Sequence, residues 1–178
     1  DPQANTTREV RIDARAPPRS THELIREEAP GSGKSAIMKT RWEGLDIIPA
    51  HADLAGAEVE LVEVAGRENR LRNALEGVDG AYDFILLDTP PSLSLLTVNV
   101  FACTSEVIVP CQTHPYAFDA LAELFDTLAA VQQEINPGLK VIGILATLYD
   151  QRTRVSRRVL DQLRQDPRYR NLLFDTVV

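Results

Sequence analysis

The feature that most constrains the fold is a short apolar run that ends in a carboxylate. Residues 82–87 have the sequence Tyr-Asp-Phe-Ile-Leu-Leu, and Asp88 follows directly. A strand with one face in water alternates apolar and polar side chains, so a nearly continuous apolar run of this length predicts a strand buried on both faces. Strands of this kind belong to parallel sheets that are covered by helices, which indicates an α/β fold.

Other apolar runs alternate with helical patterns along the rest of the chain. We expect strands at 45–50, 82–87, 106–110, 140–147 and 172–178, and helices at 20–28, 53–62, 68–75, 93–102, 116–134 and 152–165. This alternation predicts a doubly wound α/β fold, in which a mostly parallel sheet is flanked by helices on both faces. Because neither a linker nor a repeat interrupts the pattern, we expect a single domain over residues 1–178.

Composition and charge exclude several classes of protein. The 178 residues are 44% hydrophobic and carry a net charge of -7, which argues against a chain that coats nucleic acid or anionic membrane with its whole surface. No apolar run approaches the ~20 residues of a membrane span. Two cysteines, Cys103 and Cys111, are too few for a disulfide scaffold. We therefore expect a cytoplasmic protein without membrane contact.

Asp88 stands where a ligand site is expected. In doubly wound sheets, ligands bind at the carboxyl ends of the strands. An apolar strand that ends in an aspartate is the pattern of a Walker B site, where the carboxylate holds Mg²⁺ directly or through water. The alternative is an aspartate that caps the next helix. Pro90 and Pro91 favour the metal interpretation, because they stiffen the loop that follows.

Residues 82–99, from Tyr82 through Asp88-Thr89-Pro90-Pro91 to Asn99, resemble the Walker B segment of ParA-type partition ATPases, the deviant-Walker group that also contains MinD. Three further segments resemble the same family in order and spacing: 1–5, 45–61 and 143–153. The resemblance implies a P-loop NTPase-like fold.

The resemblance also implies roles for individual residues. Asp1 resembles the carboxylate that orients the attacking water, and Asp88 resembles the aspartate that organises Mg²⁺. Pro90 and Pro91 belong to the loop that changes with nucleotide state. The implied adenine edge consists of Thr147, Leu148, Tyr149 and Asp150. ATP and Mg²⁺ are accordingly the implied cofactors.

The family's phosphate loop raises a separate question. In the family, this loop lies ahead of the Asp-Pro-Gln segment, and the chains continue beyond the position of Val178. Relative to the family, residues 1–178 are therefore expected to be incomplete at both ends. Without backbone N–H groups and lysines to hold the phosphates, we expect ATP binding by these residues to be severely weakened.

Residues 31–35, Gly-Ser-Gly-Lys-Ser, resemble the end of a Walker A motif. The positions before them disagree with that motif. Glu28 replaces the first glycine, Ala29 stands where the family has its signature lysine, and Pro30 has no N–H to donate. We therefore interpret residues 31–35 as a flexible surface turn and not as a phosphate loop.

Positive charge is concentrated near the end of the chain. Residues 151–170 contain seven arginines against two aspartates, a local net charge of +5. We expect non-specific, salt-sensitive contact with the DNA backbone here, with Arg154, Arg157 and Arg158 as the main contributors. The alternative is a solvated helix face without a ligand.

These observations predict a ParA-like ATPase for plasmid or chromosome partitioning. The resemblance implies an ATP-driven homodimer that binds DNA and a ParB-like partner protein that stimulates hydrolysis. The alternative is a degenerate member of the family that does not hydrolyse ATP and acts as a binding or scaffolding module. Whether the chain is an enzyme stays open at this point, because the phosphate loop is missing from it. A MinD-like protein that cycles on membranes is disfavoured, because no C-terminal amphipathic helix is present.

Overall fold

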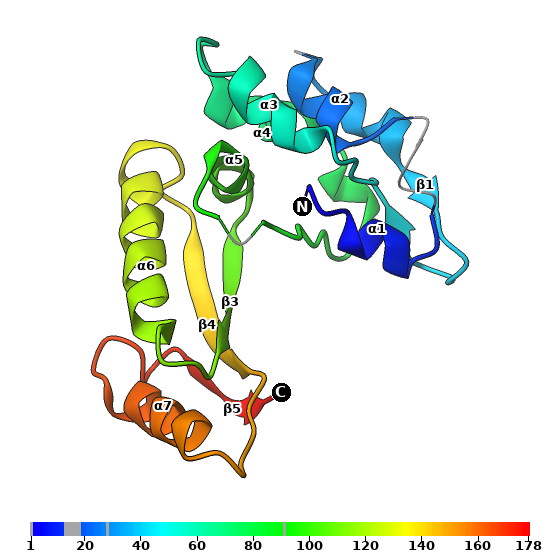
Figure 1. Cartoon of the computed structure of the whole chain (residues 1–178). Coiled ribbons are helices and arrows are strands. Elements are labelled where there is room, and N and C mark those ends of the chain that lie inside the picture. Colours follow the sequence, from blue (N-terminus) through cyan, green and yellow to red (C-terminus); the bar gives the residue numbers. More distant parts are fainter. Residues whose placement is uncertain (1, 13–18, 28, 91) are drawn as a thin grey trace. The chain divides into compact units, whose positions relative to one another are not determined.

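The computed structural model describes residues 2–12, 19–27, 29–90 and 92–178 (Figure 1). The chain divides into two compact units, an N-terminal unit (residues 1–103) and a C-terminal unit (residues 104–178). A single domain over residues 1–178 stays a prediction. In the part of the chain that the structure describes, no helix is both long and apolar enough to span a bilayer.

The C-terminal unit contains a parallel sheet in the strand order β3-β4-β5 (Figure 1). Its strands are β3 (Glu106–Gln112), β4 (Lys140–Thr147) and β5 (Leu173–Val177). Helices α6 (Ala117–Glu134) and α7 (Arg154–Gln165) connect them in turn. Parallel strands need such crossover connections because a tight turn cannot join them. The predicted strands and helices after residue 104 are thus confirmed, with shifts of one or two residues at their ends.

The core of the C-terminal unit lies between one face of this sheet and both helices. Val109 and Cys111 project from alternate positions of β3, and Ile144 lies opposite Val109 on β4. Leu121 of α6 and Leu163 of α7 pack against them in the same buried cluster. Burying these side chains is the main source of stability here, at roughly 1.5–3 kcal/mol for each large apolar residue.

The N-terminal unit is built mainly from short helices. They are α1 (Asn5–Glu9), α2 (Thr21–Arg26), α3 (Leu54–Glu60), α4 (Arg70–Ala74) and α5 (Leu95–Cys103), with 3₁₀ turns at Ser32–Ala36, Arg67–Asn69 and Asp79–Ala81. The predicted cap of α2 is confirmed. The side chain of Ser20 accepts a hydrogen bond at the start of the helix, and Glu23 accepts one from the Ser20 backbone. Residue 28, the last of the predicted helix, lies outside the described residues.

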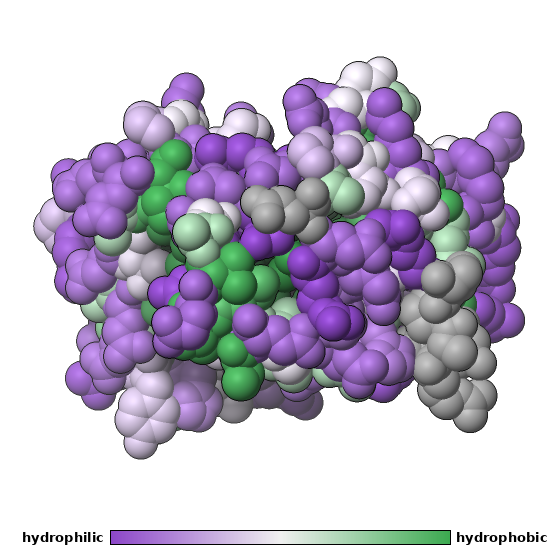
Figure 2. Space-filling view, turned by 90° about the horizontal axis from the view of Figure 1, so that it is seen from above, coloured by the Kyte–Doolittle hydropathy of each residue, from purple (hydrophilic) through white to green (hydrophobic). Residues whose placement is uncertain are grey.

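The prediction of a doubly buried strand at residues 82–87 is wrong in this structure. Residues 83–88 have no regular secondary structure, and the side chains of Phe84 and Leu86 are 85% and 91% exposed. An apolar run is buried on both faces only when strands pair on either side of it, and among the described residues none pairs with this run. Figure 2 shows hydrophobic residues, in green, at the surface among hydrophilic ones.

The run at residues 45–50 also differs from the prediction. Its strand β2 (Asp46–Ile47) pairs antiparallel with β1 (Met38–Lys39) in a sheet of its own. The connection between the two strands is short, and Gly44 takes the left-handed conformation in it, with a φ of 76°. A short connection of this kind permits antiparallel pairing but not parallel pairing.

Candidate functional site

Asp88 is joined to the segment that follows the Asp-Pro-Gln sequence. The hydroxyl of Thr6, in α1, donates a hydrogen bond of 2.6 Å to Oδ2 of Asp88. Two segments that are 82 residues apart are thereby held together, and both side chains are exposed. Asp88 does not cap the next helix, because α5 begins only at Leu95.

The oxygens of this pair are of the kind that Mg²⁺ binds. Mg²⁺ is held in proteins by one or two carboxylates, with water and substrate phosphates completing its shell. Asp88 fits the first requirement, and the Thr6 hydroxyl adds a neutral oxygen beside it. In the described part of the chain, no group of three or more His, Cys, Asp or Glu side chains is suited to hold a metal ion. A carboxylate assisted by water and phosphate is therefore the arrangement that these residues fit.

The remaining residues predicted for this part of the site are only partly described. Asp1 and Pro91 lie outside the described residues. Pro90 is half-buried in the irregular segment that follows Asp88. After that segment, the hydroxyl of Thr97 in α5 donates a hydrogen bond of 2.7 Å to the carbonyl of Ser92. This contact ties the end of the loop to α5.

Residues 31–35 form a defined turn that is exposed at Lys34 and Ser35 and buried at Gly33, and its flexibility stays a prediction. They begin the 3₁₀ turn Ser32–Ala36, and the N–H of Gly31 donates to the carbonyl of Asn73 in α4 at 2.9 Å. A Cβ atom on Gly33 would lie 2.8 Å from the carbonyl oxygen of Ala74. The glycine is therefore needed for close packing against α4, which gives this sequence a structural role.

The predicted adenine edge lies at the carboxyl end of the C-terminal sheet. Thr147 ends β4 opposite Gln112 of β3, and its carbonyl accepts a hydrogen bond of 3.1 Å from the N–H of Thr113. Leu148 takes a left-handed conformation with a φ of 51°. The N–H of Tyr149 donates to the carbonyl of Val178 at 3.0 Å. The structure thus brings residues 147–149 to the end of the sheet where ligands bind in folds of this class.

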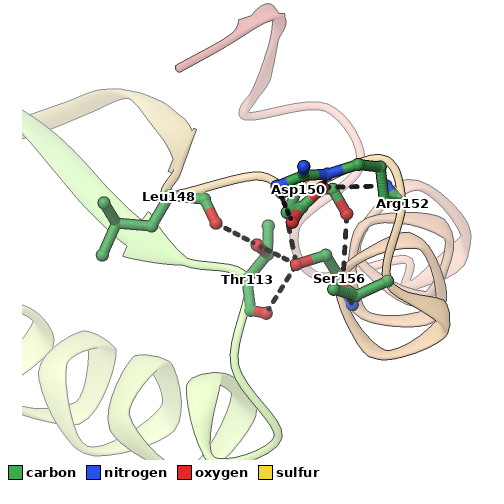
Figure 3. Close-up of polar contacts among 6 residues, drawn as sticks. Thr113, Leu148, Asp150, Arg152 and Ser156 are labelled. Carbon is green, nitrogen blue, oxygen red and sulfur yellow. Dashed lines mark hydrogen bonds and ion pairs between the residues drawn. The ribbon is translucent and has the colours of Figure 1, made fainter.

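The carboxylate of Asp150 is already engaged by Arg152. The guanidinium donates to both carboxylate oxygens, at 3.0 and 2.9 Å, and the Arg152 backbone N–H donates to Oδ1 at 2.9 Å (Figure 3). The side-chain hydrogen bond first, and the backbone hydrogen bond second, lower the pKa of Asp150. The carboxylate is thus held ionised and turned toward Arg152.

The three predicted DNA contacts share the outer face of α7. Arg154, Arg157 and Arg158 are exposed, whereas Val159 and Leu163 of the same helix are buried. Thr153 caps the helix by accepting a hydrogen bond of 3.2 Å from the Ser156 N–H. This geometry suits both the DNA interpretation and the solvated helix face.

Sequence reasoning missed three hydroxyl residues of the site. Thr6 contacts Asp88, and Thr113 and Ser156 contact each other at 3.0 Å beside the adenine edge. The spacing of Thr153 and Ser156 is that of a helix cap and its N3 residue, so it signals the start of α7. Thr113 follows directly after β3, a position where polar residues are candidates for a site.

Solved structures define the class to which this fold belongs. Cobyrinic acid a,c-diamide synthase from Mycobacterium smegmatis, solved with a bound ATP analogue and magnesium, matches with a TM-score of 0.83 and 40% identity over 92% of this chain and 66% of that one. A plasmid partition protein from Borrelia burgdorferi matches with a TM-score of 0.73 over 95% of this chain and 71% of that one, at 21% identity, which shows the fold alone. The predicted α/β, P-loop NTPase-like fold is confirmed.

Sequence comparisons define the family within this class. A family model described as an AAA domain matches residues 1–141. The sporulation initiation inhibitor protein Soj of Bacillus subtilis is 36% identical over 178 residues, all of this chain and 69% of Soj. The chromosome partitioning protein ParA of Caulobacter vibrioides is 37% identical over 180 residues, 100% of this chain and 66% of ParA. The chain therefore belongs to the ParA-type partition ATPases, and it spans about two thirds of the length of these relatives.

Proposed function

We propose that the protein is a ParA-like ATPase that partitions plasmid or chromosomal DNA. ATP-dependent homodimerisation controls its non-specific binding to DNA, and a ParB-like partner protein stimulates hydrolysis in the cytoplasm. The observation that carries this proposal is the 2.6 Å hydrogen bond between Thr6 and Asp88. It joins the segment after Asp-Pro-Gln to the end of the Walker B-like run, as a nucleotide site shared by the two segments requires.

In this proposal, each segment has a distinct chemical task. Asp88 organises Mg²⁺ beside the Thr6 hydroxyl, and Asp1 orients the water that attacks the γ-phosphate. When bound, Mg²⁺ supplies charge neutralisation to the phosphates. Pro90 and Pro91 keep the intervening loop stiff, so that it responds to the nucleotide state. The backbone of residues 147–150 lies against the adenine.

The phosphates need donors that residues 31–35 do not provide. These residues pack against α4, and the Gly31 N–H already donates a hydrogen bond to the carbonyl of Asn73. We therefore expect residues 1–178 alone to bind ATP weakly in calorimetric titrations with Mg²⁺. Tight binding would assign the phosphate role to this segment after all.

The proposal is tested by removing the Asp88 charge in the whole protein encoded by the gene. Asp88→Asn should abolish Mg²⁺-dependent ATP hydrolysis. The matched control is Asp83→Asn, which removes an exposed carboxylate from the same run and should leave hydrolysis unchanged. Equal loss in both variants, or no loss in Asp88→Asn, would contradict the role of Asp88.

A scaffolding module without hydrolysis is the second candidate. The structural role of residues 31–35 favours it, because the described residues then contribute no phosphate loop. The two candidates differ in one measurement. A scaffolding module would bind DNA or its partner protein at the same strength with and without ATP, whereas a ParA-like ATPase would bind DNA more tightly with ATP.

A further inference from the structure

Two buried hydroxyl groups meet beneath the predicted adenine edge. Thr113 follows β3, and Ser156 lies in the first turn of α7; the two residues are 6% and 7% exposed. Their hydroxyl oxygens are 3.0 Å apart (Figure 3). A buried hydroxyl needs a hydrogen-bond partner, so the contacts of this pair decide how the neighbouring loop is held.

The hydrogen bonds of the pair run in one direction. The carbonyl of Leu148 can only accept, so the single hydroxyl proton of Thr113 goes to it, at 3.1 Å. Ser156 must then donate to Thr113, whose hydroxyl oxygen lies at 3.0 Å and whose carbonyl oxygen lies at 3.4 Å. The Ser156 oxygen in turn accepts from the N–H of Asp150, at 3.5 Å. Each hydroxyl proton thus has an acceptor. A chain of this kind is cooperative, so the removal of one hydroxyl weakens all its bonds.

These linked hydrogen bonds hold residues 148–150 in a backbone conformation that the loop would otherwise leave. Leu148 has a φ of 51°, in the left-handed region that residues with a Cβ atom rarely adopt. Figure 3 shows its carbonyl directed toward Thr113 and its side chain directed away from the two hydroxyls. That side chain is 71% exposed, so it offers an apolar surface at the carboxyl end of the sheet.

We infer that Thr113 and Ser156 are positioning residues that set the backbone of residues 147–150 for the base of an adenine nucleotide. The inference rests on the proposed function. The hydroxyl pair does not touch the nucleotide but acts through the Leu148 carbonyl and the Asp150 N–H. Because the pair acts only on the loop proposed to contact the base, it affects nucleotide affinity and base preference and leaves the chemical step unchanged.

The first test measures the loop itself in the whole protein encoded by the gene. Thr113→Val keeps the branched shape and removes the hydroxyl, and it should accelerate amide hydrogen exchange at residues 148–150 about tenfold, as expected for one lost hydrogen bond. Thr113→Ser keeps the hydroxyl and should restore slow exchange. Thr127→Val is the matched control, because the Thr127 hydroxyl donates only within α6, to the Glu123 carbonyl.

Unchanged exchange in Thr113→Val would overturn the positioning role. Ser156→Ala removes the second hydroxyl of the pair, on α7. If Thr113→Val fails to fold, amide exchange at residues 148–150 is measured in Ser156→Ala instead.

The second test measures nucleotide binding with the same variants. In Thr113→Val, the KM for ATP should rise about tenfold with kcat unchanged, and the preference for ATP over GTP should shrink; Thr113→Ser should behave as wild type. If wild type binds ATP and Thr113→Val keeps the full preference, the inference fails while the proposed function stands. If wild type binds no ATP, the proposed function fails, and the role toward the base fails with it.

Discussion

At the residue scale, the Asp150–Arg152 contact controls the charge of the loop after β4. Arg152 lowers the pKa of Asp150 through its side-chain and backbone hydrogen bonds. Replacing the guanidinium by Arg152→Met should therefore raise this pKa toward the usual pKa of an aspartate. A group with a lowered pKa in the folded state stabilises the fold above its unfolded pKa. Its contribution is lost as the pH falls through the folded pKa, so the wild-type loop should loosen at low pH. The variant loop should lack this stabilisation, and with it this pH dependence, throughout.

The sequence contains its own control for this prediction. Asp166 and Arg168 repeat the same contact two residues apart, with hydrogen bonds of 3.1 and 2.8 Å from the guanidinium. The pKa of Asp166 is also lowered, first by the Arg168 side chain. An NMR titration of the carboxyl carbons should show Asp150 shifted in Arg152→Met and Asp166 unchanged. A shift in both carboxylates, or in neither, would contradict the assignment of the lowered Asp150 pKa to Arg152.

At the element scale, the 3₁₀ turn at Ser32–Ala36 should be sensitive to a single methyl group. Gly33→Ala would place a Cβ atom 2.8 Å from the carbonyl of Ala74, closer than packed atoms allow. We expect the free energy of unfolding to fall by about 1–3 kcal/mol, as for other overpacked sites. Gly80→Ala is the control, because a Cβ there has open space and Gly80 has no positive φ. Urea unfolding of both variants measures the difference. Equal stability of the two variants would contradict the packing role of Gly33 and favour a mobile turn at residues 31–35.

The cap of α2 gives a second prediction at this scale. Ser20 is buried, and its side chain accepts a hydrogen bond of 3.2 Å from the N–H of His22. Ser20→Ala should lower the free energy of unfolding by about 0.5–2 kcal/mol, the usual cost of a lost cap. Ser20→Thr retains a hydroxyl that can accept from His22 and donate to Glu23, and should recover most of that loss. If Ser20→Ala and wild type unfold at the same urea concentration, the cap contributes nothing measurable.

Which elements the sequence predicts depends on how local their causes are. The Ser20 cap and the strand at residues 140–147 follow from residues that are neighbours in the chain, and both are confirmed. The run at residues 82–87 has a strong apolar pattern, but burial of Phe84 and Leu86 requires strands on both sides, which local sequence does not provide. The hydroxyl contacts of Thr6 and Thr113 reach across 82 and 43 residues, so no spacing rule finds them.

At the scale of the whole molecule, charge is distributed unevenly. The chain carries a net charge of -7, whereas residues 151–170 carry seven arginines and two aspartates. An acidic protein is repelled by DNA except where a local patch dominates within a Debye length of about 10 Å at 0.1 M salt. Arg154, Arg157 and Arg158 form such a patch on the outer face of α7, away from the buried Val159 and Leu163. The proposed DNA contact therefore depends on a few side chains and not on the overall charge.

Reversing two of these charges should thus remove most of the binding. The double variant Arg157→Glu/Arg158→Glu should bind random-sequence DNA at least tenfold more weakly at low salt. Each phosphate contact that is lost should also reduce the slope of log K against log salt by about one. Arg41→Glu, an exposed arginine of the N-terminal unit next to Trp42, is the matched control and should leave both values unchanged. Gel-shift titrations at two salt concentrations, with ATP present, measure affinity and slope together. Loss of affinity without a change in slope would mean that the arginines maintain the fold of α7, and unchanged affinity would leave α7 as a solvated face.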